Sequence, residues 1–164
     1  GDEQPNGVVV WAVEVTNQLR AKSLRLDTAI ICCGGGGLTS GSALVFRTSF
    51  PDARIWAAEP ATHDDTGRSL AKGEHVTNDP AARSICDAIV TPTPGKLTFP
   101  IMHACGVEGR SSSDDSVLDA IAFAATTIRQ TVEPGGAVAL AVARDHLEEL
   151  KGQTVVAYLS GGKL

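Results

Sequence analysis

Short apolar runs and longer segments with helical spacing alternate along this chain. The short runs, residues 28–31, 54–58 and 154–159, contain many β-branched and other apolar residues and predict buried strands. Val8–Lys22 and Ala137–Leu150 predict helices, the second alanine-rich enough to be buried. This alternation indicates an α/β fold in which helices flank a twisted, largely parallel sheet, and we expect the 164 residues to form one domain.

The clearest predicted helix begins after Ser113, whose side chain can cap it. Asp114 and Asp115 then favour the positive end of the helix dipole. Glu133–Gly136 is expected to end this helix. Its apolar face is predicted from residues at three- and four-residue spacing: Val117, Leu118, Ile121, Ala125, Ile128 and Val132.

Shorter elements are expected in the middle of the chain. Ser42–Phe46 is compatible with a buried helix, Asp64–Leu70 with a loop that enters a short helix, and Leu97–Cys105 with a further helix. Proline and glycine punctuate the stretch from Gly73 to Pro100, and within it Asp87–Val90 predicts a short strand.

Four consecutive glycines, Gly34–Gly37, follow the first predicted strand and precede a helix. Glycine lets the backbone turn sharply there and leaves its N–H groups unshielded. The free N–H groups at the start of the next helix carry partial positive charge, so the expected ligand is a phosphate. A tight turn without a ligand is the alternative, although a turn needs only one or two glycines.

Two nucleotide motifs fit this loop incompletely. A nucleoside-triphosphate loop requires a lysine where Ser42 stands, so this assignment fails. The dinucleotide fingerprint also fails at its glycine positions, but Glu59 follows the next predicted strand, where a ribose-binding acid could lie. A dinucleotide-binding domain therefore stays as an alternative.

Ligands of parallel α/β sheets bind at the carboxyl ends of the strands. Three segments place glycine or polar groups there, namely Gly34–Gly37, Glu59 and Ser160–Gly162. We expect one crevice to gather all three.

Composition excludes several classes of protein. A hydrophobic content of 43% with 20% charged residues indicates a globular fold, and the net charge of −5 argues against nucleic acid as a partner. No apolar run approaches the ~18 residues of a membrane helix, so no membrane partner is expected. Cys32, Cys33, Cys86 and Cys105 include no Cys-x-x-Cys pair, and reduced thiols in a cytoplasmic protein fit them best.

The motifs and their order resemble an enzyme family. Cys33–Leu38, Ala57–Pro60 with Asp64 and Asp65, Glu133–Gly136 and Leu159–Gly162 are similar to segments of the pyridoxal-phosphate-dependent threonine/serine dehydratases and serine racemases. These enzymes have the tryptophan-synthase-β-like fold, fold type II. The resemblance extends over nearly the whole chain from about Gly7 and is specific for the family rather than for the substrate.

The resemblance implies roles for seven residues. The backbone amides of Gly34, Gly35, Gly36, Gly37 and Leu38 would hold the cofactor phosphate. Ser160 would form a hydrogen bond with the pyridine nitrogen, and Glu133 would lie near the ring. A neutral hydroxyl cannot keep that nitrogen protonated as a carboxylate would, which favours α-deprotonation and β-elimination.

The resemblance also implies a divalent-cation loop. Glu59, the carbonyl of His63 and Asp65 match its pattern Glu-Pro-x-x-x-Asp-Asp. Hard oxygen ligands of this kind, completed by water, suit Mg²⁺ or Ca²⁺. A surface loop with two ordinary acids is the alternative.

The segment that carries the family's catalytic lysine, Ser-x-Lys-x-Arg-Gly, does not occur here. The lysines of the chain stand in other contexts: Lys22, Lys72, Lys96, Lys151 and Lys163. The family's substrate-carboxylate loop is also absent. The resemblance therefore implies the C-terminal half of such an enzyme, the large-domain portion, with no catalytic residue of its own.

The resulting hypothesis is the cofactor-phosphate-binding half of a threonine/serine dehydratase. A complementary N-terminal half, or a second chain, would supply the Schiff-base lysine, and the assembled enzyme is expected to be a homo-oligomer. The substrate would be a β-hydroxy amino acid. Serine racemase, hydroxyaspartate dehydratase, a non-catalytic subunit and a NAD-binding domain are the alternatives.

Overall fold

The first apolar run forms the central strand of the sheet. In the computed structural model, β1 (Thr28–Cys32) is fully buried and pairs in parallel with β2 (Arg54–Pro60) on one side and β4 (Val155–Ala157) on the other. β3 (Glu108–Ser112) pairs in parallel with β2, so the strand order is β3-β2-β1-β4. The structure describes residues 6–161, so Gly162 and Lys163 lie outside the described part.

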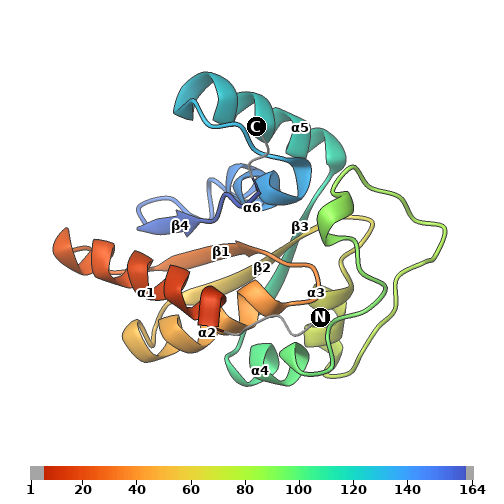
Figure 1. The fold of residues 1–164 in the computed structure, drawn as a ribbon, viewed down its shortest axis with the longest axis horizontal. Coiled ribbons are helices and arrows are strands. Elements are labelled where there is room, and N and C mark those ends of the chain that lie inside the picture. The colour runs from red at the N-terminus through yellow and green to blue at the C-terminus, as the bar shows by residue number, and fades with distance from the viewer. Residues whose placement is uncertain (1–5, 162–164) are drawn as a thin grey trace.

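Helices cover both faces of this sheet (Figure 1). Among them are α1 (Asn6–Ala21), α2 (Gly37–Ser49), α3 (Asp65–Lys72), α4 (Thr98–Ala104), α5 (Asp114–Phe123), α6 (Pro134–Asp145), the 3₁₀ turn η1 (Asp87–Ile89) and the π-helical turn η2 (Ala124–Ile128). No helix in this part of the chain is long and apolar enough to cross a membrane.

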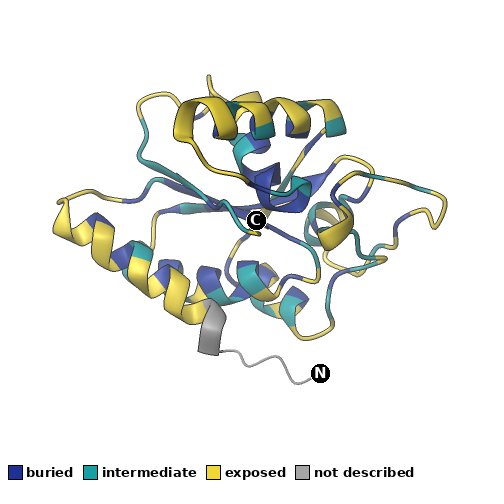
Figure 2. Cartoon of the chain, turned by 45° about the horizontal axis from the view of Figure 1, so that its top comes forward, coloured by how far each residue is buried: buried dark blue, intermediate teal, exposed yellow. Residues whose placement is uncertain are grey.

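Alternation along the strands divides the core into two layers. Ile31 and Ile55 pack on the side of α1, α2 and α4, whereas Ile30 and Trp56 pack on the side of α5 and α6. Figure 2 shows the buried residues along the sheet and on the inner faces of the helices, while the outer faces of α1 and α5 are exposed. Burial on both faces explains why β1 and β2 read as continuous apolar runs.

The predicted α/β class and its parallel sheet are confirmed, as are the helices near 8–22, 42–46, 64–70 and 97–105. Ser113 caps α5 as expected, because its hydroxyl accepts a hydrogen bond from the Ser116 amide at 3.1 Å.

Three expectations were wrong. Asp87–Val90 is not a strand, since Asp87–Ile89 forms a 3₁₀ turn closed by the Ile89 amide on the Cys86 carbonyl. The helix after Ser113 ends at Ile128 instead of Val132, and its buried side carries Val117 and Ala120 while Leu118 and Ile128 are exposed. Glu133–Gly136 does not end a helix but begins α6, with Pro134 in its first turn.

One strand was missed altogether. β3 has the sequence Glu-Gly-Arg-Ser-Ser, which lacks both an apolar run and apolar alternation. Pairing with β2 and packing against α3 place this polar segment at one margin of the sheet.

The contact of α3 with β3 depends on two glycines. A Cβ on Gly109 would lie 2.1 Å from Cα of Gly67, so the two backbones touch directly. We expect Gly109→Ala to lower the free energy of unfolding by about 2 kcal/mol, because overpacking forces the backbones apart. Urea denaturation measures the change. Gly37→Ala is the matched control, since nothing lies within 4 Å of its added Cβ, and an equal loss in both variants would contradict the account.

Candidate active site

The glycine loop joins the end of β1 to the start of α2. Gly36 adopts φ +88°, and a Cβ on it would lie 2.7 Å from Cε of Met102. Both the left-handed backbone and the lack of space therefore demand glycine at this position. Gly36 is also the residue that precedes α2, and no side chain caps that helix.

The loop is anchored through the carbonyl of Gly35. This oxygen accepts hydrogen bonds from the amide of Gly95 at 3.2 Å and from the hydroxyl of Thr98 at 2.5 Å. In a trans peptide the N–H of Gly36 must then point the opposite way. Among the described residues, the amides of Gly34–Gly36 donate to no backbone acceptor.

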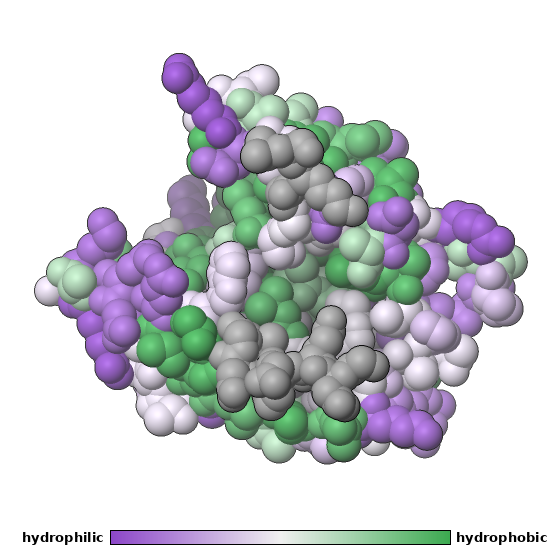
Figure 3. Space-filling view, in the orientation of Figure 1, coloured by the Kyte–Doolittle hydropathy of each residue, from purple (hydrophilic) through white to green (hydrophobic). Residues whose placement is uncertain are grey.

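Open space lies beside the loop. A Cβ added to Gly35 or Gly37 would meet no atom within 4 Å, and both residues are exposed. In Figure 1 the loop lies between the helical layers, and Figure 3 shows this face hollowed there, with apolar surface inside the hollow. Free amides at an uncapped helix N-terminus beside open space can bind an anion.

Glu133 and Ser160 lie together near the end of β4. The amide of Glu133 donates to the carbonyl of Gly161 at 3.0 Å, and the amide of Ser160 donates to the carbonyl of Gly136 at 3.3 Å. A Cβ on Gly136 would lie 1.4 Å from the Ser160 carbonyl oxygen, so α6 and the C-terminal segment approach as closely as backbones can. The Glu133 carboxylate packs against Gly161, whose Cβ would lie 2.1 Å from Oε1.

Two side chains connect this pair to the glycine loop. The thiol of Cys32, two residues before Gly34, donates to the carbonyl of Gly136 at 3.5 Å. Ile89 lies against both segments, since a Cβ on Gly34 would be 3.2 Å from its Cα and a Cβ on Gly135 would be 3.4 Å from its Cγ1. The structure therefore brings the predicted cofactor residues to the same edge of the sheet.

Sequence reasoning missed the residues that hold this edge in place. Gly95 and Thr98 anchor the loop and Ile89 separates it from α6, yet all three lie where the sequence pattern indicates only turns and short elements. The turn signal Thr93-Pro94-Gly95 before α4 was the one available indication of a fixed turn.

Glu59 does not face the crevice, which corrects the expectation that three segments would meet there. Its carboxylate accepts hydrogen bonds from the amides of Thr66 and Gly67, both at 2.8 Å, and thereby caps α3. Burial raises the pKa of Glu59 to about 8, although those two hydrogen bonds lower it. A ribose hydroxyl could not reach this carboxylate, so the structure does not support the dinucleotide alternative.

Asp65 is equally engaged by the protein. Its carboxylate accepts hydrogen bonds from Nδ2 of Asn78 at 2.6 Å and from the hydroxyl of Thr91 at 3.5 Å, and burial raises its pKa. Nδ1 of His63 lies 3.0 Å from the hydroxyl of Thr62. The hydrogen bonds of Asp65 to Asn78 and Thr91 tie the loop after Lys72 to the start of α3.

The predicted cation loop is not supported. In the part of the chain that the structure describes, no group of three His, Cys, Asp or Glu side chains is arranged to hold a metal ion. Glu59 and Asp65 direct their oxygens to protein donors instead.

The cysteines near the site are poor nucleophiles. Burial and, to a smaller extent, the nearby Glu59 carboxylate together raise the pKa of Cys33 to about 12. Burial also raises the pKa of Cys32. Both thiols therefore stay protonated at neutral pH, and neither is positioned for covalent catalysis.

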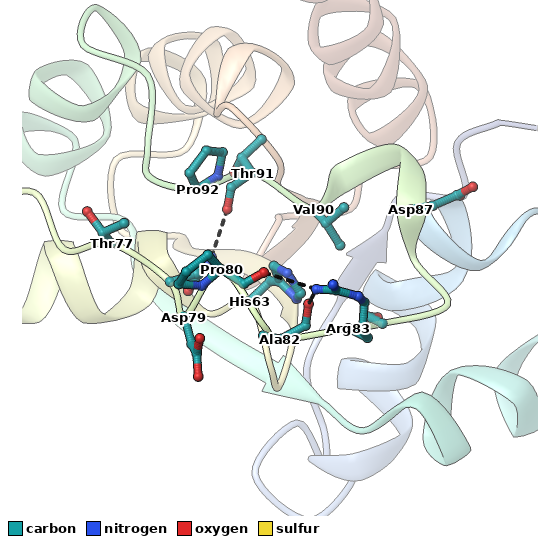
Figure 4. A pocket seen from close by; sticks show the side chains of 12 residues that line it. His63, Thr77, Asp79, Pro80, Ala82, Arg83, Asp87, Val90, Thr91 and Pro92 are labelled. Atoms are coloured by element: carbon teal, nitrogen blue, oxygen red, sulfur yellow. Dashed lines mark hydrogen bonds between the residues drawn. The ribbon is translucent and has the colours of Figure 1, made fainter.

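A cavity of about 530 Å³ lies beside the segment that contains Ile89 (Figure 4). His63, Arg83, Val90 and Thr91 are among the residues that line it, and the Arg83 guanidinium donates to the carbonyls of Pro80 and Ala82 at 3.0 and 2.7 Å. The segment 87–92 thus lines the cavity with Asp87, Val90, Thr91 and Pro92, while its Ile89 lies against Gly34 of the glycine loop.

The structure is an α/β domain with a parallel sheet, and its glycine loop presents free amides beside open space. Residues 4–161 match the family described as "Pyridoxal-phosphate dependent enzyme", and the chain belongs to this family of fold type II enzymes.

Several relatives are known by name. The chain is 34% identical to the serine racemase of Schizosaccharomyces pombe and 32% identical to the L-threo-3-hydroxyaspartate ammonia-lyase of Pseudomonas sp., in each case over 85% of this chain and 43% of the relative. It superposes on the crystal structure of the T.th. threonine deaminase with a TM-score of 0.89 at 30% identity, covering 98% of this chain and 54% of that one. The chain thus spans about half the length of the relatives it matches.

The buried carboxylate of Glu59 predicts a pH dependence of stability. Its folded pKa of about 8 lies above the ordinary 4.5, so between these values the folded protein binds a proton that the unfolded chain lacks. The free energy of unfolding should therefore fall as pH rises from about 5 to 8. Glu59→Gln should flatten this slope in urea titrations at several pH values, whereas Asp52→Asn, at an exposed position, should keep it. Equal slopes in all three proteins would refute the assignment.

Proposed function

We propose that this chain is the phosphate-binding half of a pyridoxal-phosphate-dependent ammonia-lyase that acts on L-threonine or L-serine. A complementary polypeptide would supply the lysine that binds the cofactor and removes the α-proton. The products would be a 2-oxo acid and ammonia, formed by loss of water across Cα and Cβ and subsequent hydrolysis.

The anchored glycine loop is the observation that carries this proposal. Gly35 and Gly37 leave room where any other residue would project a side chain, and the hydrogen bonds to the Gly35 carbonyl hold the loop in one conformation. Binding a phosphate there would cost little reorganisation, because the amides are already oriented. The residues present therefore fit the phosphate of the cofactor.

The chain's own polar groups would set the electronics of the site. When bound, pyridoxal phosphate supplies a conjugated ring that acidifies the Cα–H of an attached amino acid. The hydroxyl of Ser160 would contact the ring nitrogen without holding it protonated, which favours elimination at Cβ. Glu133 packs against Gly161 next to Ser160 and would place a carboxylate near the ring.

Relatives with two other reactions make racemisation of serine and elimination from hydroxyaspartate the closest competing functions. All three reactions begin with removal of the α-proton, and they differ in whether the substituent on Cβ is then lost. Product analysis with threonine, serine and hydroxyaspartate separates them.

Gly35→Val tests the phosphate site on the isolated chain. A valine side chain would occupy the open space beside the loop, so the affinity for pyridoxal 5′-phosphate should fall at least tenfold while the fold is kept. Equilibrium dialysis gives the affinity and circular dichroism the fold. Ala125→Val, at an exposed position of η2, is the control and should bind normally. Unchanged binding by Gly35→Val would contradict the proposal.

Reconstitution tests the reaction. The part of the T.th. threonine deaminase that the match leaves uncovered would be co-expressed with this chain, and 2-oxobutyrate would be followed after addition of threonine. We expect product only when both polypeptides and the cofactor are present. A stable, cofactor-loaded assembly that forms no 2-oxo acid from any of the three substrates would favour a non-catalytic subunit instead.

A further inference from the structure

Cys32 is a buried residue to which the proposed chemistry gives no role. It is the last residue of β1, 4% exposed, and lies two positions before Gly34. Its carbonyl accepts a hydrogen bond at 3.4 Å from the hydroxyl of Thr39, in the first turn of α2. The main chain of Cys32 is therefore attached to both ends of the glycine loop.

The side chain of Cys32 reaches the segment that contains Ser160. The thiol lies 3.5 Å from the carbonyl oxygen of Gly136 and 3.6 Å from that of Tyr158, and it can donate to either. The Gly136 carbonyl also accepts a hydrogen bond from the Ser160 amide at 3.3 Å. The thiol therefore contacts the residue two positions before Ser160 and shares an acceptor with Ser160 itself.

This contact lies just beyond the end of the strand pairing. The last backbone hydrogen bond between β1 and the residues after β4 runs from the Tyr158 amide to the Ile30 carbonyl. Beyond it, in the part of the chain that the structure describes, Ser160 and Gly161 form their backbone hydrogen bonds with the start of α6. The Cys32 thiol is thus the group of β1 that reaches this segment after the pairing has stopped.

The chemistry of this thiol suits a hydrogen-bond donor. Burial raises the pKa of Cys32 and outweighs the opposing effects of the Ala139 amide and the Ser160 hydroxyl, which interact with the sulfur. The sulfur therefore carries its proton at neutral pH, and two carbonyl oxygens lie within its reach. A protonated thiol in this place can hold neighbouring segments together without reacting.

We propose that Cys32 is a positioning residue that sets the separation between the glycine loop and the hydroxyl of Ser160. This inference rests on the proposed function, in which the loop binds the phosphate of pyridoxal phosphate and Ser160 contacts its ring nitrogen. Both groups belong to one small ligand, so the two parts of the site must keep their spacing to within about 0.5 Å. The carbonyl of Cys32 fixes the loop side of that spacing, and its thiol fixes the Ser160 side.

Cys32→Ala tests this role in the isolated chain, with two phosphate ligands as probes. Pyridoxine 5′-phosphate has the ring and the phosphate of the cofactor but no aldehyde, so it cannot react with lysines. The variant should bind this ligand about fivefold more weakly, which is the effect of one misplaced neutral hydrogen bond. Its affinity for inorganic phosphate, which contacts the loop alone, should not change. Equilibrium dialysis measures both affinities.

Three further variants separate positioning from general stability. Cys32→Ser keeps a donor at this place and should restore most of the affinity for pyridoxine 5′-phosphate. Cys105→Ala removes another buried thiol, at the end of α4, and should bind both ligands normally. In a Ser160→Ala background, Cys32→Ala should have no further effect, because the two residues act together. Equal losses for both ligands, unchanged affinity, or additive losses in the double variant would overturn the proposal.

Amide chemical shifts give a second measurement that needs no variant. Pyridoxine 5′-phosphate should move the amide resonances of residues 34–38 together with those of Gly136 and Ser160, whereas inorganic phosphate should move only the former. Movement of residues 34–38 alone by both ligands would overturn this inference and leave the phosphate site of the proposed function intact. Binding of neither ligand would refute the proposed function and the inference with it.

Discussion

The two hydrogen bonds to the Gly35 carbonyl hold the glycine loop, on which the proposed phosphate site depends. Gly95 and Thr98 fix this one oxygen, and the planar peptide then fixes the direction of the next N–H. Gly36 can follow only because it lacks a side chain. A run of glycines would otherwise be flexible. The hydrogen bonds to the Gly35 carbonyl therefore order the loop and fix the directions of its amide donors.

The acidic residues near this edge of the sheet have two different environments. The sequence suggested Glu59 and Asp65 as ligands of a divalent cation. In the structure their carboxylates instead accept hydrogen bonds that hold α3 and the long loop after it. The N-terminus of α3 offers Glu59 two well-aligned amides, and these hydrogen bonds offset the cost of burying its carboxylate. Glu133 is only half-buried beside Ser160, where a ligand could reach it.

Much of the fold followed from pattern, and the failures have physical causes. β1 and β2 could be predicted because burial on both faces leaves continuous apolar runs. The cap formed by Ser113 could be predicted because capping depends only on neighbouring residues. β3 could not be predicted, because a strand at the edge of a sheet can be polar throughout. The end of the helix after Ser113 was also missed. Arg129 adopts a left-handed backbone there, and an arginine does not indicate that conformation in the sequence.

Only part of the candidate site could be predicted from the sequence. Gly34–Gly37, Leu38, Glu133 and Ser160 were predicted from motifs, and the structure brings them to one edge of the sheet. Ile89, Gly95 and Thr98 could not be predicted, because their part in the site arises from contacts between segments distant in sequence. Motifs reveal groups that carry chemistry, whereas the groups that orient them depend on tertiary packing.

The central claim is that the loop amides bind a phosphate, and amide chemical shifts test it most directly. Pyridoxal 5′-phosphate or inorganic phosphate would be titrated into the isotopically labelled chain. The account predicts that the amide resonances of residues 34–38 move together and saturate with either ligand. Stationary resonances at these positions, with shifts confined to the cavity beside His63, would contradict it.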